Sequence, residues 1–134
     1  MEPQRIVQAV LALYSVDQKS VSSALGVHLP PFRDNPFWVF FRAENVGVFS
    51  YVHLALSKTA PTWRVSFRYS LDHCNYLESS VDFSVYGPVV RADLNPDIRP
   101  EGAWINVYHY SGYKLSFEIA PKSRRILGGT VEFP

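Results

Sequence analysis

The amino-acid sequence predicts an α+β fold, in which a short N-terminal pair of helices precedes an antiparallel, curved sheet of about six or seven strands. Two patterns lead to this expectation. Apolar residues recur at helical spacing only before residue 26, whereas runs of β-branched and aromatic residues separated by turn signals begin at residue 37. Aromatic residues make up 15% of the chain, which also favours strands. Helices followed by hairpins indicate a sheet covered by helices on one face.

The chain has 134 residues, close to the commonest size of one domain. A second independent core would leave each half near the lower limit for folding alone. We therefore expect a single domain over residues 1–134, with a helical segment at 1–26 and mainly strands at 37–134.

Two helices are expected in the N-terminal segment. Apolar residues from Ile6 to Tyr14 follow a helical period after Pro3, which suits a first helical turn, and this predicts a helix over residues 3–14. Ser15 and Gln18 have the spacing of a capping box, and Gly26 is a typical stop. The second helix is therefore expected at 16–25.

The rest of the chain is predicted to alternate between strands and turns. The prolines in residues 28–36 and 94–102 indicate two loops, whereas residues 72–80 give no clear pattern. Gly128-Gly129 is interpreted as a basic turn after Arg124 and Arg125. The expected strands are residues 37–42, 48–56, 63–71, 81–86, 104–110, 113–120 and 130–133.

Composition argues against several classes of protein. Lys and Arg total 13 against 12 Asp and Glu, so generic nucleic-acid binding is not expected. No apolar run is long enough for a membrane-spanning helix, and the N-terminus lacks the pattern of a signal peptide. Cys74 is the only cysteine, so no internal disulfide can form. These features lead us to expect a soluble, cytoplasmic protein that does not bind membranes.

No motif indicates catalysis, a cofactor or a metal. Asp72, His73 and Cys74 are the residue types of a thiol nucleophile with its base, but consecutive residues point apart in an extended chain. The four histidines lack metal-ligand spacing. If a pocket enzyme exists here, His53, His109 and Asp82 are the candidate titratable residues inside it.

The face of the sheet that the helices leave uncovered must meet solvent, a ligand or a partner. Tyrosine, tryptophan and arginine are enriched at the energetic centres of protein interfaces. Candidate partner-binding residues are Arg64, Arg68, Trp104, Tyr108, Tyr110, Arg124 and Arg125. The alternative is that a curled sheet buries its aromatic side chains within itself.

Two functions remain open on this basis. The first is a non-catalytic protein-binding module with one protein partner, such as a small bacterial immunity or inhibitor protein that neutralises a toxin or enzyme. The second is a small-molecule-binding or enzymatic α+β cone with an aromatic-lined pocket. Because no catalytic motif is present, the sequence favours a binding protein over an enzyme. It also allows a homodimer formed by pairing of a strand edge with a second copy.

Overall fold

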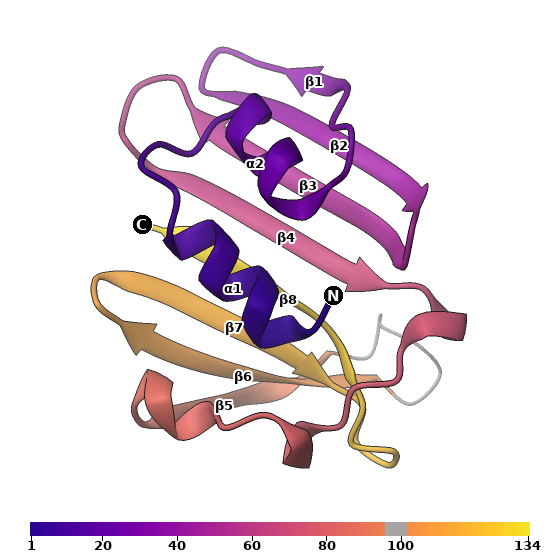
Figure 1. Cartoon of the computed structure of the whole chain (residues 1–134). Helices are drawn as coiled ribbons and strands as arrows, with labels where there is room; N and C mark the ends of the chain where they lie inside the picture. Colours follow the sequence, from indigo (N-terminus) through magenta and orange to yellow (C-terminus); the bar gives the residue numbers. More distant parts are fainter. Residues whose placement is uncertain (96–101) are drawn as a thin grey trace.

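The computed structural model describes residues 1–95 and 102–134, and it has two α-helices followed by eight strands (Figure 1). The helices are α1 (Pro3–Leu11) and α2 (Gln18–Leu25). The strands are β1 (Pro31–Asp34), β2 (Trp38–Val46), β3 (Phe49–Ser57), β4 (Trp63–Tyr69), β5 (Val89–Asn95), β6 (Ala103–Tyr110), β7 (Tyr113–Ile119) and β8 (Ile126–Phe133). Three short 3-10 turns, η1 (Leu71–His73), η2 (Glu78–Ser80) and η3 (Phe83–Tyr86), lie between β4 and β5.

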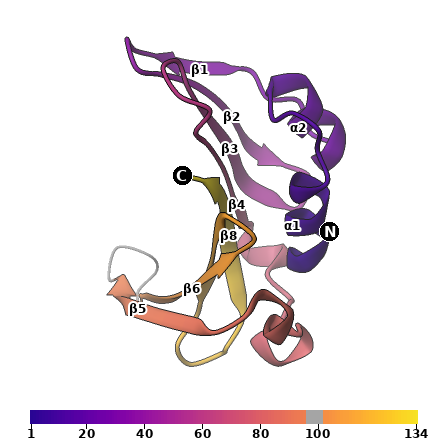
Figure 2. The ribbon, with the colours of Figure 1, turned by 90° about the vertical axis from the view of Figure 1, so that its left-hand side faces the viewer.

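The eight strands form one antiparallel sheet in the order β1-β2-β3-β4-β8-β7-β6-β5. Strands β1 to β4 follow one another and form one half of the sheet. Residues 71–87 then lead to β5 at the opposite edge, and β6, β7 and β8 follow inward from there. The last strand, β8, pairs with β4 and so joins the two halves. Seen from the side, the sheet bends away from the helices, and its helix-free face is concave (Figure 2). The predicted α+β class and the antiparallel, curved sheet are thus confirmed.

Both helices begin and end for local reasons. Pro3 occupies the first turn of α1, as expected, and Ile6, Val7 and Val10 are buried against the sheet. The helix ends at Leu11 rather than at residue 14, and Tyr14 is fully exposed. The apolar period therefore extended one turn beyond the true helix.

The capping box of α2 uses other residues than the predicted Ser15 and Gln18. Asp17 accepts a hydrogen bond from the backbone N–H of Ser20, and the Ser20 hydroxyl accepts one from the Asp17 N–H. Gly26 ends the helix at φ 66°, the left-handed conformation that glycine adopts at low cost. The predicted C-terminal stop is confirmed.

The helices and the segment at residues 71–87 cover the same face of the sheet. In Figure 1, α1 lies in front of the central strand β8 and α2 lies in front of β2 and β3. Aromatic residues of the 71–87 segment pack against β6 and β7. A single cluster of buried side chains connects these elements; its largest fully buried members include Phe67, Phe117, Ile6, Leu29, Leu54 and Leu115. None of the helices in the described part of the chain is long and apolar enough to span a membrane.

The strand count was too low, and one expected strand was wrong. Residues 83–86 form a 3-10 turn instead of the strand predicted at 81–86. The short strand β1 lies within the proline-containing loop expected at 28–36, and β5 was missed. The expected loop at 94–102 begins inside β5, and its residues 96–101 lie outside the described part of the chain.

The Gly128-Gly129 pair is part of strand β8 and not a turn. A Cβ at Gly128 would overlap the backbone carbonyl of Phe67, and one at Gly129 would lie 2.8 Å from the carbonyl of Ser116. Glycine is needed here because neighbouring backbones approach closely, which is one reason for glycine inside a strand.

Candidate functional site

The concave face opposite the helices, here called the open face, is the first candidate site. Buried Val52, Leu54, Val65 and Phe67 mark the helix side of β3 and β4, so the residues that alternate with them point to the open face. Strand pairing then places neighbouring side chains from each strand in rows across this face. Six neighbouring strands contribute to this face, in the sheet order β2, β3, β4, β8, β7 and β6. Their open-face residues, in the same order, are Trp38, Phe40, Arg42, Glu44, Tyr51, His53, Ala55, Ser57, Arg64, Ser66, Arg68, Gly128, Thr130, Glu132, Lys114, Ser116, Glu118, Ile105, Val107 and His109.

Arginine and aromatic side chains alternate along one end of the open face. The Arg42 guanidinium carbon lies 4.2 Å from the ring centroid of Tyr51 and 5.7 Å from that of Phe32. On the other side of Tyr51, the Arg68 guanidinium carbon lies 5.5 Å from the same ring centroid. Burial raises the pKa of Tyr51, which keeps the hydroxyl protonated beside the two cations. Stacking of guanidinium groups on ring faces holds these long side chains in place.

Arg68 also connects the two halves of the sheet. Its Nη2 donates a hydrogen bond of 2.7 Å to Oε2 of Glu118, although β8 lies between their strands. Gly128 is the residue of β8 in register with both. Because Gly128 has no side chain, the guanidinium and the carboxylate meet above it, and their side chains are only 26% and 20% exposed.

A row of small hydroxyl side chains runs beside this ion pair. Ser66, Thr130 and Ser116 follow one another in register on β4, β8 and β7, and Thr130 Oγ1 donates to Ser66 Oγ at 3.2 Å. The next row contains charged side chains, with Arg64 Nε 3.9 Å from Glu132 Oε1. The centre of the open face is therefore polar, with its charges largely paired.

His53 lies on the aromatic end of the open face. Its ring centroid is 5.6 Å from that of Phe40 and 6.0 Å from that of Phe32. Burial lowers the pKa of His53, and the nearby charges of Arg42 and Arg64 lower it further. The imidazole is therefore neutral at pH 7, and its buried Nδ1 has no hydrogen-bond partner among the described residues.

The predicted partner-binding residues separate into three places. Arg64 and Arg68 lie on the open face, as their alternation with Trp63 indicated. Trp104, Tyr108 and Tyr110 lie on the helix side of β6. There Tyr108 is buried, with its ring stacked on that of Phe83 and edge-on to that of Tyr86.

Arg124 and Arg125 hold the segment between β4 and β5 against the sheet. The Arg124 guanidinium carbon lies 4.6 Å from the ring centroid of Trp104, and its Nη1 is 3.6 Å from Glu78 Oε1. Arg125 Nη1 donates to the carbonyl oxygen of Cys74 at 3.0 Å. These contacts give both arginines an internal structural role.

The three candidate pocket residues are not brought together. His53 lies on β3 and His109 on β6, and β4, β8 and β7 separate their strands. Asp82 lies outside the sheet, where its carboxylate accepts a hydrogen bond from the N–H of Ser84 at the start of η3. Within the described ranges, no group of three or more metal-ligating side chains gathers. Cys74 is buried, and its Sγ lies 3.2 Å from the carbonyl oxygen of Ile126.

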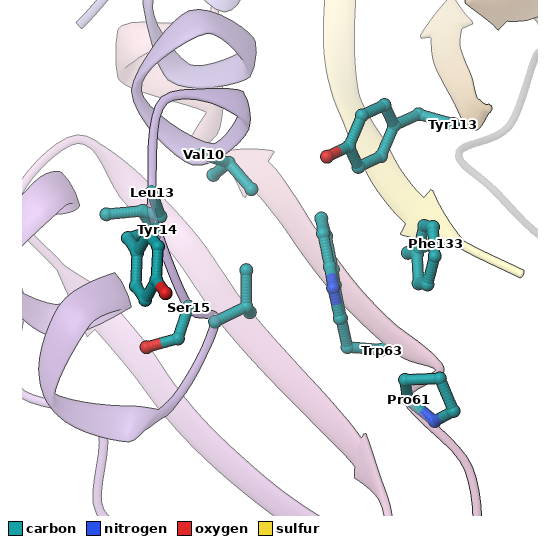
Figure 3. A pocket seen from close by; sticks show the side chains of 9 residues that line it. Val10, Leu13, Tyr14, Ser15, Pro61, Trp63, Tyr113 and Phe133 are labelled. Atoms are coloured by element: carbon teal, nitrogen blue, oxygen red, sulfur yellow. The ribbon is translucent and has the colours of Figure 1, made fainter. Parts of the chain in front are cut away.

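A pocket on the helix side is the second candidate site (Figure 3). It has a volume of about 340 Å³ and lies where α1 ends, beside the β3–β4 loop. Trp63, Tyr113 and Phe133 form one wall, with ring centroids 5.8 to 6.3 Å apart. Its lining residues are Val10, Leu13, Tyr14, Ser15, Val16, Pro61, Trp63, Tyr113 and Phe133.

Several residues of these sites could not be found by examining one strand at a time. Arg42, Tyr51 and Glu118 become neighbours only through the register of strands, and Phe32 lies in the segment expected to be a loop. The available signal was alternation along residues 38–44 and 49–57, which places their residues on two faces. Comparisons with protein-family models, with curated proteins and with solved structures found no match.

Proposed function

We propose that this protein is a non-catalytic protein-binding module that engages one partner protein through its open face. The observation that carries the proposal is the concave face, which no helix in the described part of the chain covers. On this face Trp38, Phe40 and Tyr51 are placed among arginine side chains, namely Arg42, Arg64 and Arg68. Aromatic and arginine side chains are enriched among residues that contribute most to protein binding. Trp38 and Phe40 stack on each other, and Arg42 and Arg68 both lie over the ring of Tyr51, so these side chains would lose little freedom on binding.

The separation of titratable residues also supports a binding role. An acid–base site needs its groups within hydrogen-bond reach of one reacting molecule. His53, His109 and Asp82 lie on three separate elements, and the Arg68–Glu118 pair is an internal ion pair. A module that controls another protein needs none of this chemistry.

Within this class, we propose that the protein is a cytoplasmic inhibitor of the immunity type, which neutralises a toxin or enzyme by covering part of its surface. A concave sheet fits a convex partner, and the internally paired charges avoid isolated charges at the centre of the interface. The presence of one buried cysteine is compatible with a reducing compartment.

An affinity capture with matched baits tests this proposal. We would use the wild-type protein, a Trp38→Ala/Arg64→Ala variant of the open face, and a Leu71→Ala variant as the control, because Leu71 is an exposed residue outside the sheet. We expect one protein from the source organism to bind wild type and control in equal amounts, and to be lost from the open-face variant.

The same experiment can contradict the proposal. Equal retention of every protein by all three baits would overturn the assignment to the open face. A small molecule retained in place of any protein would favour the alternative, a small-molecule-binding α+β fold. A change in molar mass to that of a homodimer, measured by light scattering, would identify a second copy as the occupant of the face if the open-face variant abolished it.

A further inference from the structure

The helix-side pocket has a chemistry that differs from that of the open face. One wall is the aromatic group of Trp63, Tyr113 and Phe133, and the opposite side is formed by the end of α1 and by Tyr14, which is fully exposed (Figure 3). None of the described residues that line this pocket is charged. Because a charge placed against such a surface would lose hydration without a partner, the pocket favours an uncharged ligand.

The pocket also presents polar groups that are not used within the protein. In the part of the chain that the structure describes, neither the indole N–H of Trp63 nor the hydroxyl of Tyr113 makes a hydrogen bond to another residue. Tryptophan and tyrosine usually place such a group toward water or a ligand when their rings are partly buried. The ligand should therefore offer apolar surface together with hydrogen-bond acceptors.

The exposure of Tyr14 argues against a small enclosed molecule. Pockets for small molecules bury most of the ligand surface. Here one wall residue stands fully in solvent, so a ligand would be covered on the side of Trp63 and remain accessible beside Tyr14. A chain segment that enters and leaves the pocket fits this shape better than a molecule that must be surrounded.

We propose that this pocket binds a proline-rich peptide segment in the polyproline II conformation. Each proline supplies an apolar ring and a carbonyl acceptor but no N–H donor, which complements aromatic rings flanked by the Trp63 and Tyr113 donors. The polyproline II helix exists before binding, so a shallow aromatic groove can hold it at low entropic cost. This inference is independent of the proposed function, because the pocket lies on the face opposite to the open face.

Binding of acetylated, amidated decaproline to the full chain tests this assignment. In ¹⁵N-resolved NMR spectra, the indole signal of Trp63 should move saturably with peptide, while those of Trp38 and Trp104 should stay in place. A glycine–serine peptide of the same length should leave all three signals unchanged. Absence of any Trp63 response at peptide concentrations on the order of 1 mM would overturn the proposal.

Two variants assign the contacts without disturbing the fold. Tyr14→Ala removes a fully exposed side chain, and Tyr113→Phe removes only a hydroxyl that has no hydrogen bond to the described residues. Each should weaken decaproline binding by about fivefold or more. Leu71→Ala, on the short turn after β4, should bind as wild type does. Unchanged affinity for decaproline in both pocket variants would contradict the proposal. It would also be contradicted if the Trp63 signal moved with free indole, a small aromatic molecule, but not with decaproline, because the pocket would then bind a small molecule and not a peptide.

Discussion

Gly128 lies so close to the backbone carbonyl of Phe67 that no other residue fits there without a shift of strand β8 or β4. Gly128 also lies directly beneath the Arg68–Glu118 ion pair, between their two strands. One missing side chain thus allows the two halves of the sheet to approach and allows their side chains to meet above the junction.

We expect Gly128→Ala to lower the free energy of unfolding by about 1–3 kcal/mol, because the added methyl group forces the backbones apart. Ser116→Ala is the matched control, since Ser116 lies on the same face of neighbouring β7, and it should change stability by less than about 0.5 kcal/mol. Urea denaturation of the three proteins measures both effects. A Gly128→Ala variant as stable as wild type would contradict the close approach.

Arg68 and Glu118 should be strongly coupled energetically. Their hydrogen bond is 2.7 Å long, and both side chains are mostly buried, so water screens the charges little. A double-mutant cycle with Arg68→Met and Glu118→Gln should give a coupling energy of about 1–2 kcal/mol.

Arg64 and Glu132 provide the matched control on the same face. Their atoms are 3.9 Å apart, and the Arg64 side chain is 49% exposed. The corresponding cycle should give less than about 0.5 kcal/mol, because exposed and loosely aligned ion pairs contribute little. Equal coupling energies in the two cycles would show that geometry and burial do not distinguish these pairs.

His53 should make stability depend on pH in the mildly acidic range. Its folded-state pKa lies below the ordinary value of 6.5, because burial and the charges of Arg42 and Arg64 disfavour the imidazolium. The unfolded chain then binds more protons than the folded one as the pH falls below 6.5, so protonation favours unfolding. This contribution to stability is fully present above the unfolded-state pKa and is lost as the pH falls.

NMR titration of the His53 ring, with denaturation at about pH 7.5 and about pH 5, measures the effect. We expect a titration midpoint below 6.5, and a smaller loss of stability between these pH values in His53→Gln than in wild type. A midpoint at or above 6.5 would show that the two arginines and burial do not control this histidine.

The fold class was accessible from the sequence because its signals are local. The helical period ended before residue 26, and alternation in residues 63–69 separated the buried from the open face correctly. The errors arose where local preference and the position in the sheet conflict. Pro31 indicated a loop, because proline has no N–H to donate to a neighbouring strand. However, β1 is a short strand at the edge of the sheet, and an edge strand has one side without a partner strand, where a missing N–H costs no hydrogen bond.

The candidate site was less accessible because it depends on register. Arg68 was identified from its own strand, but its partner Glu118 is 50 positions away and is aligned with it only through Gly128. Conversely, Trp104 and Tyr108 were predicted to bind a partner, but Phe83 stacks on Tyr108 and the Arg124 guanidinium lies over the ring of Trp104. A pattern within one strand cannot reveal which segment will cover it.

Arg125 should control the local order of the segment that follows β4. Its guanidinium donates to the carbonyl oxygen of Cys74, and an isolated bridge between Leu77 and Arg125 holds the same part of the segment. In Arg125→Met, the side-chain hydrogen bond is lost while much of the apolar stem remains, so residues 74–80 should open more often.

Hydrogen–deuterium exchange measures this opening directly. Exchange in residues 74–80 should be several-fold faster in Arg125→Met than in wild type, with exchange in β3 and β4 unchanged, because those strands keep all their ladder hydrogen bonds. Lys122→Met is the matched control, since Lys122 is an exposed cation in the same β7–β8 connection. If Lys122→Met accelerated exchange at residues 74–80 to the same degree, general loss of positive charge would explain the effect, and the Arg125–Cys74 hydrogen bond would not be what orders the segment.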